Sequence, residues 1–259
     1  MSIKRLFLDI EVSPCVGYFW RPGRNLNIPY ENIVKEGAII CIAYKWHGKD
    51  EVYSMTWEDG DDYEMLLKFI TVVNSVDEAI GHNCDRFDLK WLRARCMYHR
   101  IPFPAHIQSF DTLKASRGQL ALNSHRLDYI AKYLGVGQKN NDSGFGLWRG
   151  VMEGDSKSLK DMVKYCKNDV VILEKVYDEL YKYSKPKIHA AVHVGGFKHH
   201  CPSCGSPDTK RNRKKTTAAG VPKVQMICNE CNHYYTLAES VYWKSVTAEA
   251  ESKALSHIE

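Results

Sequence analysis

The chain has 259 residues, enough for one sizeable hydrophobic core and a small additional module. No apolar run approaches the ~18 residues that a membrane-spanning helix needs, and the N-terminus has no signal-peptide pattern. The formal net charge of +5 is uneven: residues 186–259 hold ten Lys and Arg against six Asp and Glu, which leaves 26 against 25 in residues 1–185. The basic excess therefore belongs to the C-terminal part, where it permits nucleic-acid binding without being diagnostic of it.

The nine cysteines are distributed in two ways: five are scattered, and four form two close pairs near the C-terminus. This distribution is typical of a reduced, intracellular protein with a metal site, and not of a disulfide framework. We therefore expect a cytoplasmic protein.

The first predicted element is a short buried strand, Leu6-Phe7-Leu8-Asp9-Ile10-Glu11-Val12. Residues two apart on a strand point to the same face, so Asp9 and Glu11 are expected side by side. Two adjacent carboxylates on a mostly buried strand repel and are costly to desolvate, and a divalent cation removes that cost. The alternative interpretation is an edge strand with two solvated acids.

An irregular segment, residues 13–37, follows this strand and is rich in aromatic residues, Pro and Asn. Loops of this length are usually functional or disordered. Two interpretations of Trp20 and Arg21 stay open: base stacking with phosphate contact, or packing of the loop onto its own domain.

The residues that follow alternate between strand and helix patterns, which predicts an α/β layer with a mixed sheet. The predicted elements are strands 38–46 and 51–57, helix 62–73, strand 79–82, helix 87–100, strand 107–110, helices 112–117 and 124–134, a Gly- and Asn-rich loop over 140–154, and a helix over 158–183.

Two further acids, Asp85 and Asp88, lie where the strand over 79–82 gives way to a helix. Ligands of open α/β sheets collect at such strand ends. Asp85 has the position of a helix N-cap and Asp88 the third position of the same helix, so first-turn stabilisation is an alternative for both. The residues alone do not choose between the two acids.

The long helix carries Tyr165 and Asp169, which lie four apart and so stack on one face. They fall at the border of the apolar arc, where an acid can reach into a cleft beside the core. Glu174 falls on the opposite, solvated side. A Tyr and an Asp at the shoulder of a helix are also common without a function.

These motifs, taken in order, resemble a known family. Asp-x-Glu on the first strand, Asn-x-x-x-Phe-Asp at a strand–helix junction and Tyr-x-x-x-Asp on a late helix look like the three motifs of the DEDD superfamily of 3′→5′ exonucleases. This superfamily includes the proofreading domains of DNA polymerases, and the Tyr of the third motif is that of its tyrosine subclass. The resemblance covers residues 1–183 and implies an RNase-H-like fold.

The resemblance also implies roles for the residues that match. Asp88 follows Phe87 and matches the family acid, whereas Asp85 does not. Asp9, Glu11 and Asp169 would hold one Mg²⁺ or Mn²⁺, Asp9 would bridge to a second ion supported by Asp88, and Tyr165 would orient the attacking water. The chain departs from many members at Val12, where they carry Thr, and we expect this to affect substrate contact more than metal binding.

The C-terminal part contains Cys201, Cys204, Cys228 and Cys231 as two C-x₂-C pairs separated by 23 residues. This spacing is typical of a structural Zn²⁺ site with four thiolates, and the module resembles a zinc ribbon. Because four Cys complete a tetrahedron, His199, His200 and His233 are expected to be surface residues.

Between the two pairs lies a run of five cations in six residues, Lys210, Arg211, Arg213, Lys214 and Lys215. A charge run is usually a solvated loop, but on a ribbon joined to a predicted nuclease we favour a loop that contacts phosphate. A protein-docking role is a third interpretation.

The sequence therefore predicts a two-metal 3′→5′ exonuclease that carries one structural Zn²⁺ and acts on single-stranded DNA, alone or with a replication or repair protein. The alternatives are an exoribonuclease and a non-catalytic nucleic-acid-binding or scaffold protein. The expected division is a nuclease domain at 1–184, a linker at 185–198, a zinc ribbon at 199–243 and a polar tail at 244–259.

Overall fold

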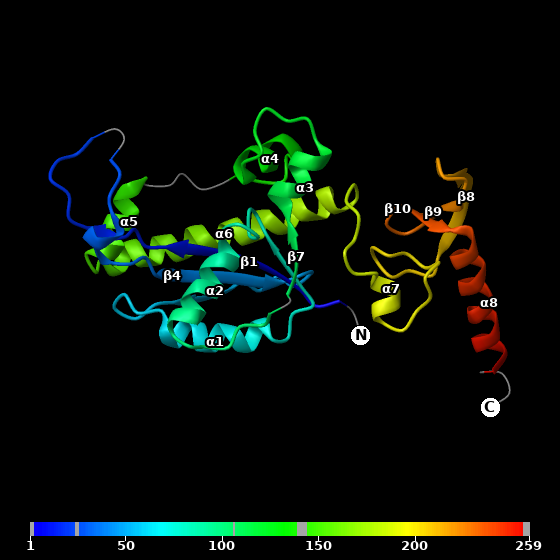
Figure 1. The fold of residues 1–259 in the computed structure, drawn as a ribbon, viewed down its shortest axis with the longest axis horizontal. Helices are drawn as coiled ribbons and strands as arrows, with labels where there is room; N and C mark the ends of the chain where they lie inside the picture. The colour runs from blue at the N-terminus through cyan, green and yellow to red at the C-terminus, as the bar shows by residue number, and fades with distance from the viewer. Residues whose placement is uncertain (1–2, 24–25, 106, 139–143, 256–259) are drawn as a thin grey trace. The chain divides into compact units, whose positions relative to one another are not determined.

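The computed structural model describes residues 3–23, 26–105, 107–138 and 144–255. The chain divides into two compact units, one formed by Lys4–Tyr177 and one that contains Asp178–Glu259 (Figure 1). Among the described residues, no helix combines the length and the apolar character that crossing a membrane requires.

The N-terminal unit is built on a five-stranded mixed sheet with the order β5-β4-β1-β6-β7. The central strand β1 (Arg5–Val12) pairs antiparallel with β4 (Ile39–Trp46) and parallel with β6 (Glu78–Gly81). The outer strands are β5 (Tyr53–Thr56) and β7 (Gln108–Asp111). The predicted mixed α/β sheet is confirmed, and the acid-bearing strand lies at its centre and not at an edge.

One face of the sheet carries a large hydrophobic core. Leu6, Leu8 and Ile10 of β1 pack there with apolar residues of α1 (Tyr63–Val73) and α2 (Asp88–Tyr98). Because side chains alternate along a strand, the odd-numbered residues of β1 point to the other face.

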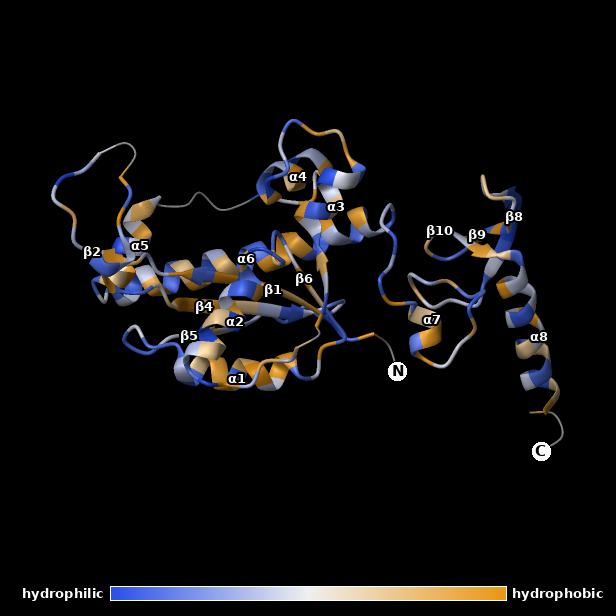
Figure 2. Ribbon diagram, viewed as in Figure 1, coloured by the Kyte–Doolittle hydropathy of each residue, from blue (hydrophilic) through white to orange (hydrophobic). Residues whose placement is uncertain are grey.

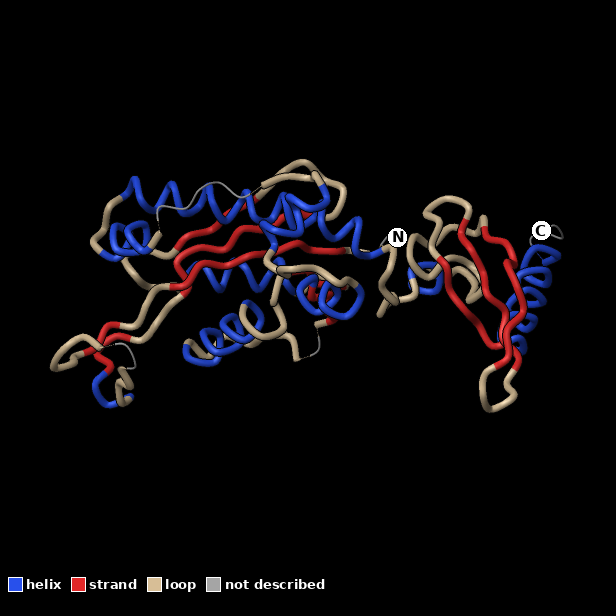
Figure 3. The backbone as a smooth tube through the Cα atoms, turned by 90° about the horizontal axis from the view of Figure 1, so that it is seen from above, coloured by secondary structure: helices blue, strands red, loops and turns tan. Residues whose placement is uncertain are grey.

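The other face of the sheet is covered by α6 (Ser156–Tyr181). Phe7 of β1 meets Tyr177 of α6 edge to face, with ring centroids 5.1 Å apart. Figure 3 shows the strands between this long helix and the helices of the opposite face. Asp9 and Glu11, which share the face of Phe7, therefore point toward α6.

A buried ion pair joins α6 to the sheet. Lys45 of β4 bonds to Glu174, whose second carboxylate oxygen accepts the backbone N–H of Gly48 at 2.8 Å. The prediction that Glu174 is solvated was wrong, because this partner lies 129 positions away in the sequence and leaves no mark on the helical periodicity.

Several shorter elements complete the N-terminal unit. The loop expected over 140–154 contains a helix, α5, from Phe145 onward; residues 140–143 of that expected loop lie outside the described residues. The shorter elements of this unit are β2 (Val16–Gly17), η1 (Tyr30–Asn32), β3 (Ile33–Lys35), α3 (Thr112–Gln119), α4 (Leu127–Leu134) and α5 (Phe145–Met152).

The C-terminal unit is a three-stranded antiparallel sheet with the order β10-β9-β8, followed by a helix. Its basic run is not a loop but the edge strand β8 (Thr209–Thr216). Residues expected as a linker contain the helix α7 (Ala190–His193), and residues expected as a polar tail continue α8 (Glu239–Leu255). The other two strands are β9 (Pro222–Cys228) and β10 (Tyr234–Ala238).

Candidate functional site

The first two acids of the candidate site lie side by side on β1. Asp9 and Glu11 are both half-buried, and on β4 they stand opposite Ala43 and Cys41. β1 itself forms because its alternate residues Leu6, Leu8 and Ile10 are buried in the core.

Cys166 brings α6 into contact with these acids. Its thiol donates to the backbone oxygen of Asp9 at 3.3 Å and to the Asp9 carboxylate at 3.4 Å. Potential ligand atoms of Asp9, Glu11 and Cys166 all lie within 4.8 Å of one another. Burial, the neighbouring Cys41 and the two carboxylates raise the pKa of Cys166 well above its ordinary value, so the thiol stays a hydrogen-bond donor.

The sequence analysis did not predict the contact between Cys166 and Asp9. The only available signal was the position of Cys166 between Tyr165 and Asp169. Asp169 is 3% exposed and follows Cys166 by three residues, which puts it on the same side of the helix. Tyr165 is half-buried and directly precedes Cys166.

Asp88 approaches the same strand from the start of α2. Its carboxylate accepts the backbone N–H of Ile10 at 3.2 Å, and the side chain is 3% exposed. Burial first, and then the negative charge of Asp9, hold the pKa of Asp88 well above its usual range, although backbone hydrogen bonds oppose this. The fold thus places a buried acid beside Asp9, and the two like charges repel.

Asp85 belongs to a different set of contacts. Its carboxylate accepts from the hydroxyl of Ser109 at 2.5 Å and from the ammonium of Lys114 at 2.6 Å. The expected N-cap role of Asp85 was wrong, since α2 begins at Asp88, and Phe87 holds the cap position. The charge of Asp85 is balanced by Lys114, whereas that of Asp88 faces another acid.

Asp111 is a buried acid whose importance the sequence did not reveal. It caps α3 by accepting the N–H groups of Leu113 and Lys114, and it accepts those of Asn83 and Asp85 at 3.0 and 3.3 Å. These last two bonds fix the turn between β6 and α2. Asp111 is therefore a positioning residue for the turn that leads into Asp88.

Two aromatic positions show contrasting placements. Trp148 of α5 donates its indole N–H to the backbone oxygen of Val12 at 3.1 Å, directly after the acids on β1. Trp20 is fully exposed, and Arg21 is also exposed, in the segment that follows β2. The structure therefore ties Trp148 to the acid-bearing strand and leaves Trp20 on the surface.

The acids of the N-terminal unit, Asp9, Glu11 and Asp88, which we call the N-terminal cluster, offer oxygen ligands that suit hard divalent cations. Carboxylate oxygens are the ligands that Mg²⁺ and Mn²⁺ prefer. A cation held by Asp9 and Asp88 would offset the repulsion that raises the pKa of Asp88. The cluster is therefore suited to a metal in a way that the Asp85 contacts, already balanced by Lys114, are not.

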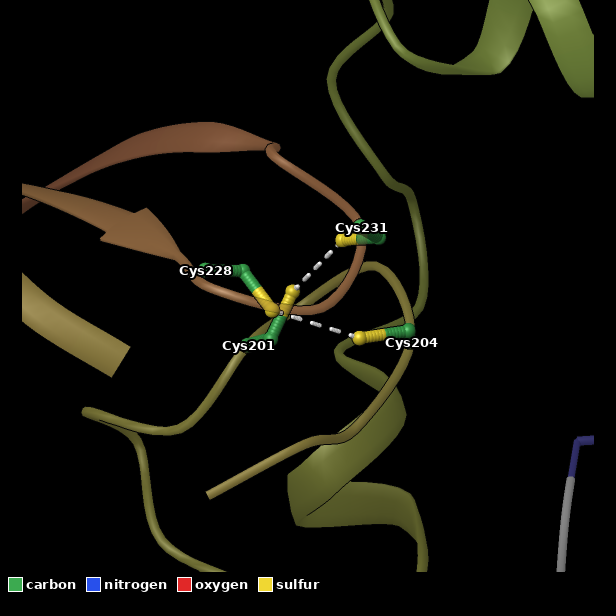
Figure 4. Close-up of side chains that lie close together, drawn as sticks. All are labelled: Cys201, Cys204, Cys228 and Cys231. Atoms are coloured by element: carbon green, nitrogen blue, oxygen red, sulfur yellow. Dashed lines mark hydrogen bonds between the residues drawn. The ribbon is translucent and has the colours of Figure 1, made fainter. Parts of the chain in front are cut away.

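The four paired cysteines converge in the C-terminal unit (Figure 4). The sulfur atoms of Cys201 and Cys231 lie 3.6 Å apart, as do those of Cys204 and Cys228. Thiolates around a tetrahedral Zn²⁺, with Zn–S bonds of about 2.3 Å, stand about 3.8 Å apart. The cluster therefore fits a structural zinc site.

The three histidines near this cluster are buried and not on the surface as predicted; His199, His200 and His233 are 8, 8 and 5% exposed. His199 and His200 meet the carboxylate of Glu249 on α8 at 2.9 and 3.5 Å. His233 lies within 3.3 Å of the backbone oxygen of Lys182. The first two contacts hold α8 against His199 and His200, and the third holds the segment after α6 against His233.

Comparisons with known proteins agree with the architecture of the N-terminal unit. A family model described as RNase_H superfamily matches residues 33–181, more than half of the chain. No curated protein matches the sequence.

Among solved structures, the chain is similar to the family B DNA polymerase from the hyperthermophilic archaeon Pyrobaculum calidifontis, with 18% identity and a TM-score of 0.52. The match covers 70% of this chain and 25% of the polymerase chain, so the present chain corresponds to a limited part of that enzyme. At this identity the likeness concerns the fold, and it supports an RNase-H-like architecture.

Proposed function

The chain belongs to the RNase H superfamily, and from this premise we propose that it is a metal-dependent 3′→5′ exonuclease with an appended zinc ribbon. The observation that carries the proposal is the pairing of Asp88 with β1, because it sets a buried acid against Asp9. The proposed substrate is single-stranded DNA, and the proposed products are nucleoside 5′-monophosphates. The proposed catalytic domain is residues 1–184.

The four acids Asp9, Glu11, Asp88 and Asp169 would hold two Mg²⁺ or Mn²⁺ ions. Bound divalent cations of this kind lower the pKa of water and neutralise charge on the leaving oxygen. The contributions of the chain itself are the fixed positions of the acids: β1 presents Asp9 and Glu11 together, and Ile10 holds the carboxylate of Asp88 through its backbone N–H.

Tyr165 is proposed to orient the attacking water. A protonated Tyr hydroxyl is a hydrogen-bond donor and a poor base, so hydrogen bonding to water is the better role for it. Its place one residue before Cys166, which contacts Asp9, supports this assignment.

One structural Zn²⁺ is proposed for Cys201, Cys204, Cys228 and Cys231. The same unit is proposed to bind nucleic acid through its basic strand, with Trp20 and Arg21 of the other unit as further contacts. Because phosphate contacts position a substrate without reading its sequence, this would add affinity and not base specificity. A replication or repair protein is a proposed partner.

The test is hydrolysis of single-stranded DNA and RNA in Mg²⁺ or Mn²⁺, comparing the wild type with Asp9→Ala. We expect metal-dependent hydrolysis that Asp9→Ala abolishes. Hydrolysis of RNA alone would identify the exoribonuclease alternative. Binding without hydrolysis of either polymer would identify a non-catalytic binding protein.

A further inference from the structure

The basic strand β8 has two different faces. A β-bulge between Arg211 and Arg213 inserts Asn212 into the strand, so the side-chain alternation changes phase there. Residues paired across strands share a face, and the partners on β9 therefore show where each cation points. Figure 2 shows β8 as a hydrophilic strand, but the register divides its charge between the two faces.

Two of the five cations face α8. Arg211 pairs with the buried Met226 and lies over the rings of Tyr242 and Trp243, at 5.4 and 5.3 Å from their centroids. Lys214, on the same face, bonds to Glu239 at 3.1 Å. These two cations hold the helix to the sheet.

The remaining three cations lie on the opposite face, which we call the open face. Lys210, Arg213 and Lys215 pair with Ile227, Gln225 and Lys223 of β9. The open face continues across β10, where Tyr234, Thr236 and Ala238 stand opposite Ile227, Gln225 and Lys223. Tyr234 is 54% exposed.

The open face is rich in positive charge. The strands β8, β9 and β10 contain no Asp or Glu. Lys215 and Lys223 stand directly opposite each other, an arrangement that costs stability unless an anion lies between them. The face is thus built for a negatively charged ligand.

A groove continues this face beyond β10. It lies between β10 and the segment before α7 and has a volume of about 870 Å³. Lys185, Lys187, Lys223, Tyr183 and Tyr234 are among the residues that line it, and no Asp or Glu does so in the described part of the chain. Tyr183 is 67% exposed.

We propose that the open face and this groove bind single-stranded nucleic acid. The Lys and Arg side chains meet phosphates, and the exposed rings of Tyr183 and Tyr234 stack on bases. Stacking of this kind requires bases that are free of a duplex, which favours a single strand. The inference rests on the proposed nuclease function for its biological setting and refines it, because Arg211 and Lys214 are excluded from the contact surface.

The test compares two double variants of the full, zinc-loaded chain, each of which removes one Lys and one Arg from β8. The open-face variant is Lys210→Gln with Arg213→Gln, and the matched control is Lys214→Gln with Arg211→Gln. Both are made with Asp9→Asn, which prevents hydrolysis of the probe. Binding of a labelled oligothymidylate of about 20 nucleotides is measured against salt concentration, with a duplex and polyglutamate as competitors.

We expect the open-face variant to bind more weakly and to lower the salt slope, −d log K/d log [salt], by about 1.4 for two lost single-strand phosphate contacts. The control variant should keep the slope of its parent, provided that its zinc content and melting temperature are unchanged. Tyr234→Ala should weaken binding about tenfold. Equal losses in the two double variants, or displacement of the strand by polyglutamate or duplex as readily as by oligothymidylate, would overturn the inference.

The two proposals fail separately. Because these measurements do not involve hydrolysis, a chain that hydrolyses DNA but keeps the parental salt slope in the open-face variant overturns only the binding surface. A chain that shows the predicted slopes but never hydrolyses a strand overturns only the nuclease function.

Discussion

The two units gather metal-binding side chains by opposite means. In the N-terminal unit a large hydrophobic core positions β1. The fold holds Asp9 and Asp88 close together, although burial and mutual repulsion destabilise the ionised form of Asp88. In the C-terminal unit the described residues of β9 and β10 form a small hydrophobic cluster with three buried members, Val224, Met226 and Tyr235, and two partly buried neighbours. The comparison indicates that the first fold holds its proposed metal ligands together against their repulsion, whereas in the second the proposed zinc site stabilises the fold.

The largest expected effect is therefore removal of zinc. Structural zinc contributes about 10–16 kcal/mol of apparent binding free energy in small domains, and the cluster around Val224 is too small to replace it. Chelation, or Cys228→Ser, should unfold the C-terminal unit and leave the N-terminal unit folded. Amide hydrogen exchange measured separately for residues 4–177 and 199–238 would show this. Cys15→Ser, at an exposed cysteine outside the cluster, is the control.

The next effect concerns the core of the N-terminal unit and should not depend on any metal. Asp62 is fully buried and accepts two bonds from Arg95 at 2.8 Å, one from the backbone N–H of Ile39, and one from His99. Asp62→Asn would leave the Arg95 charge unpaired and should cost about 3–5 kcal/mol in the free energy of unfolding. Asp61→Asn, at an exposed neighbour, should cost less than about 1 kcal/mol.

This pair also predicts a pH dependence. Burial raises the pKa of Asp62, but the bonds from Arg95, Ile39 and His99 outweigh it and leave the pKa below its usual value. The stabilisation is therefore complete above the unfolded pKa of about 3.9 and is lost as the pH falls through the lower folded value. Urea denaturation between pH 7 and pH 2 should show a smaller loss in Asp62→Asn than in the wild type. If the unfolding free energies of the wild type and Asp62→Asn fell in parallel with pH, Asp62 would not be the group responsible for the acid loss of stability.

A smaller effect of opposite sign is expected at Asp88. Because its pKa is raised by burial and by Asp9, its ionised form destabilises the metal-free protein at neutral pH. Asp88→Asn should raise the unfolding free energy of the metal-free protein by about 1–3 kcal/mol. The metal-free wild type should lose stability as the pH rises from about 4 through the folded pKa, and the variant should not.

Added Mn²⁺ gives the complementary measurement. It should raise the melting temperature of the wild type more than that of Asp88→Asn. If Asp88→Asn destabilises the metal-free chain, the carboxylate is a structural group and the contrast between the two units fails.

Periodicity and spacing are local signals, and they predicted the mixed sheet and the convergence of the four paired cysteines. The set of four acids was assigned from the family resemblance and stays a prediction. Contacts between distant residues were not predictable in this way. Nothing in the sequence around Glu174 indicated its ion pair with Lys45. The burial of His199 and His200 depends on Glu249, about 50 positions further along the chain. The sequence also left Asp85 and Asp88 undecided, and the resemblance favoured Asp88. Only the structure shows that the carboxylate of Asp85 is already bonded to Ser109 and Lys114.

The register of β8 is a second case. Five cations in six residues predicted a charged segment, but the bulge at Asn212, which divides them between two faces, appears only when the partners on β9 are known. The C-terminal helix is a similar case: residues expected as a polar tail continue α8, and its contacts with the sheet and the histidines are not visible in its polar sequence.

The most direct test of the central claim uses a 5′-labelled DNA single strand and two matched variants, Asp88→Asn and Asp85→Asn. The wild type and Asp85→Asn should shorten the strand one nucleotide at a time from its 3′ end in Mg²⁺ or Mn²⁺, while Asp88→Asn should leave it intact. Activity that survives Asp88→Asn, or release of the 5′ label before the strand shortens, would contradict the account.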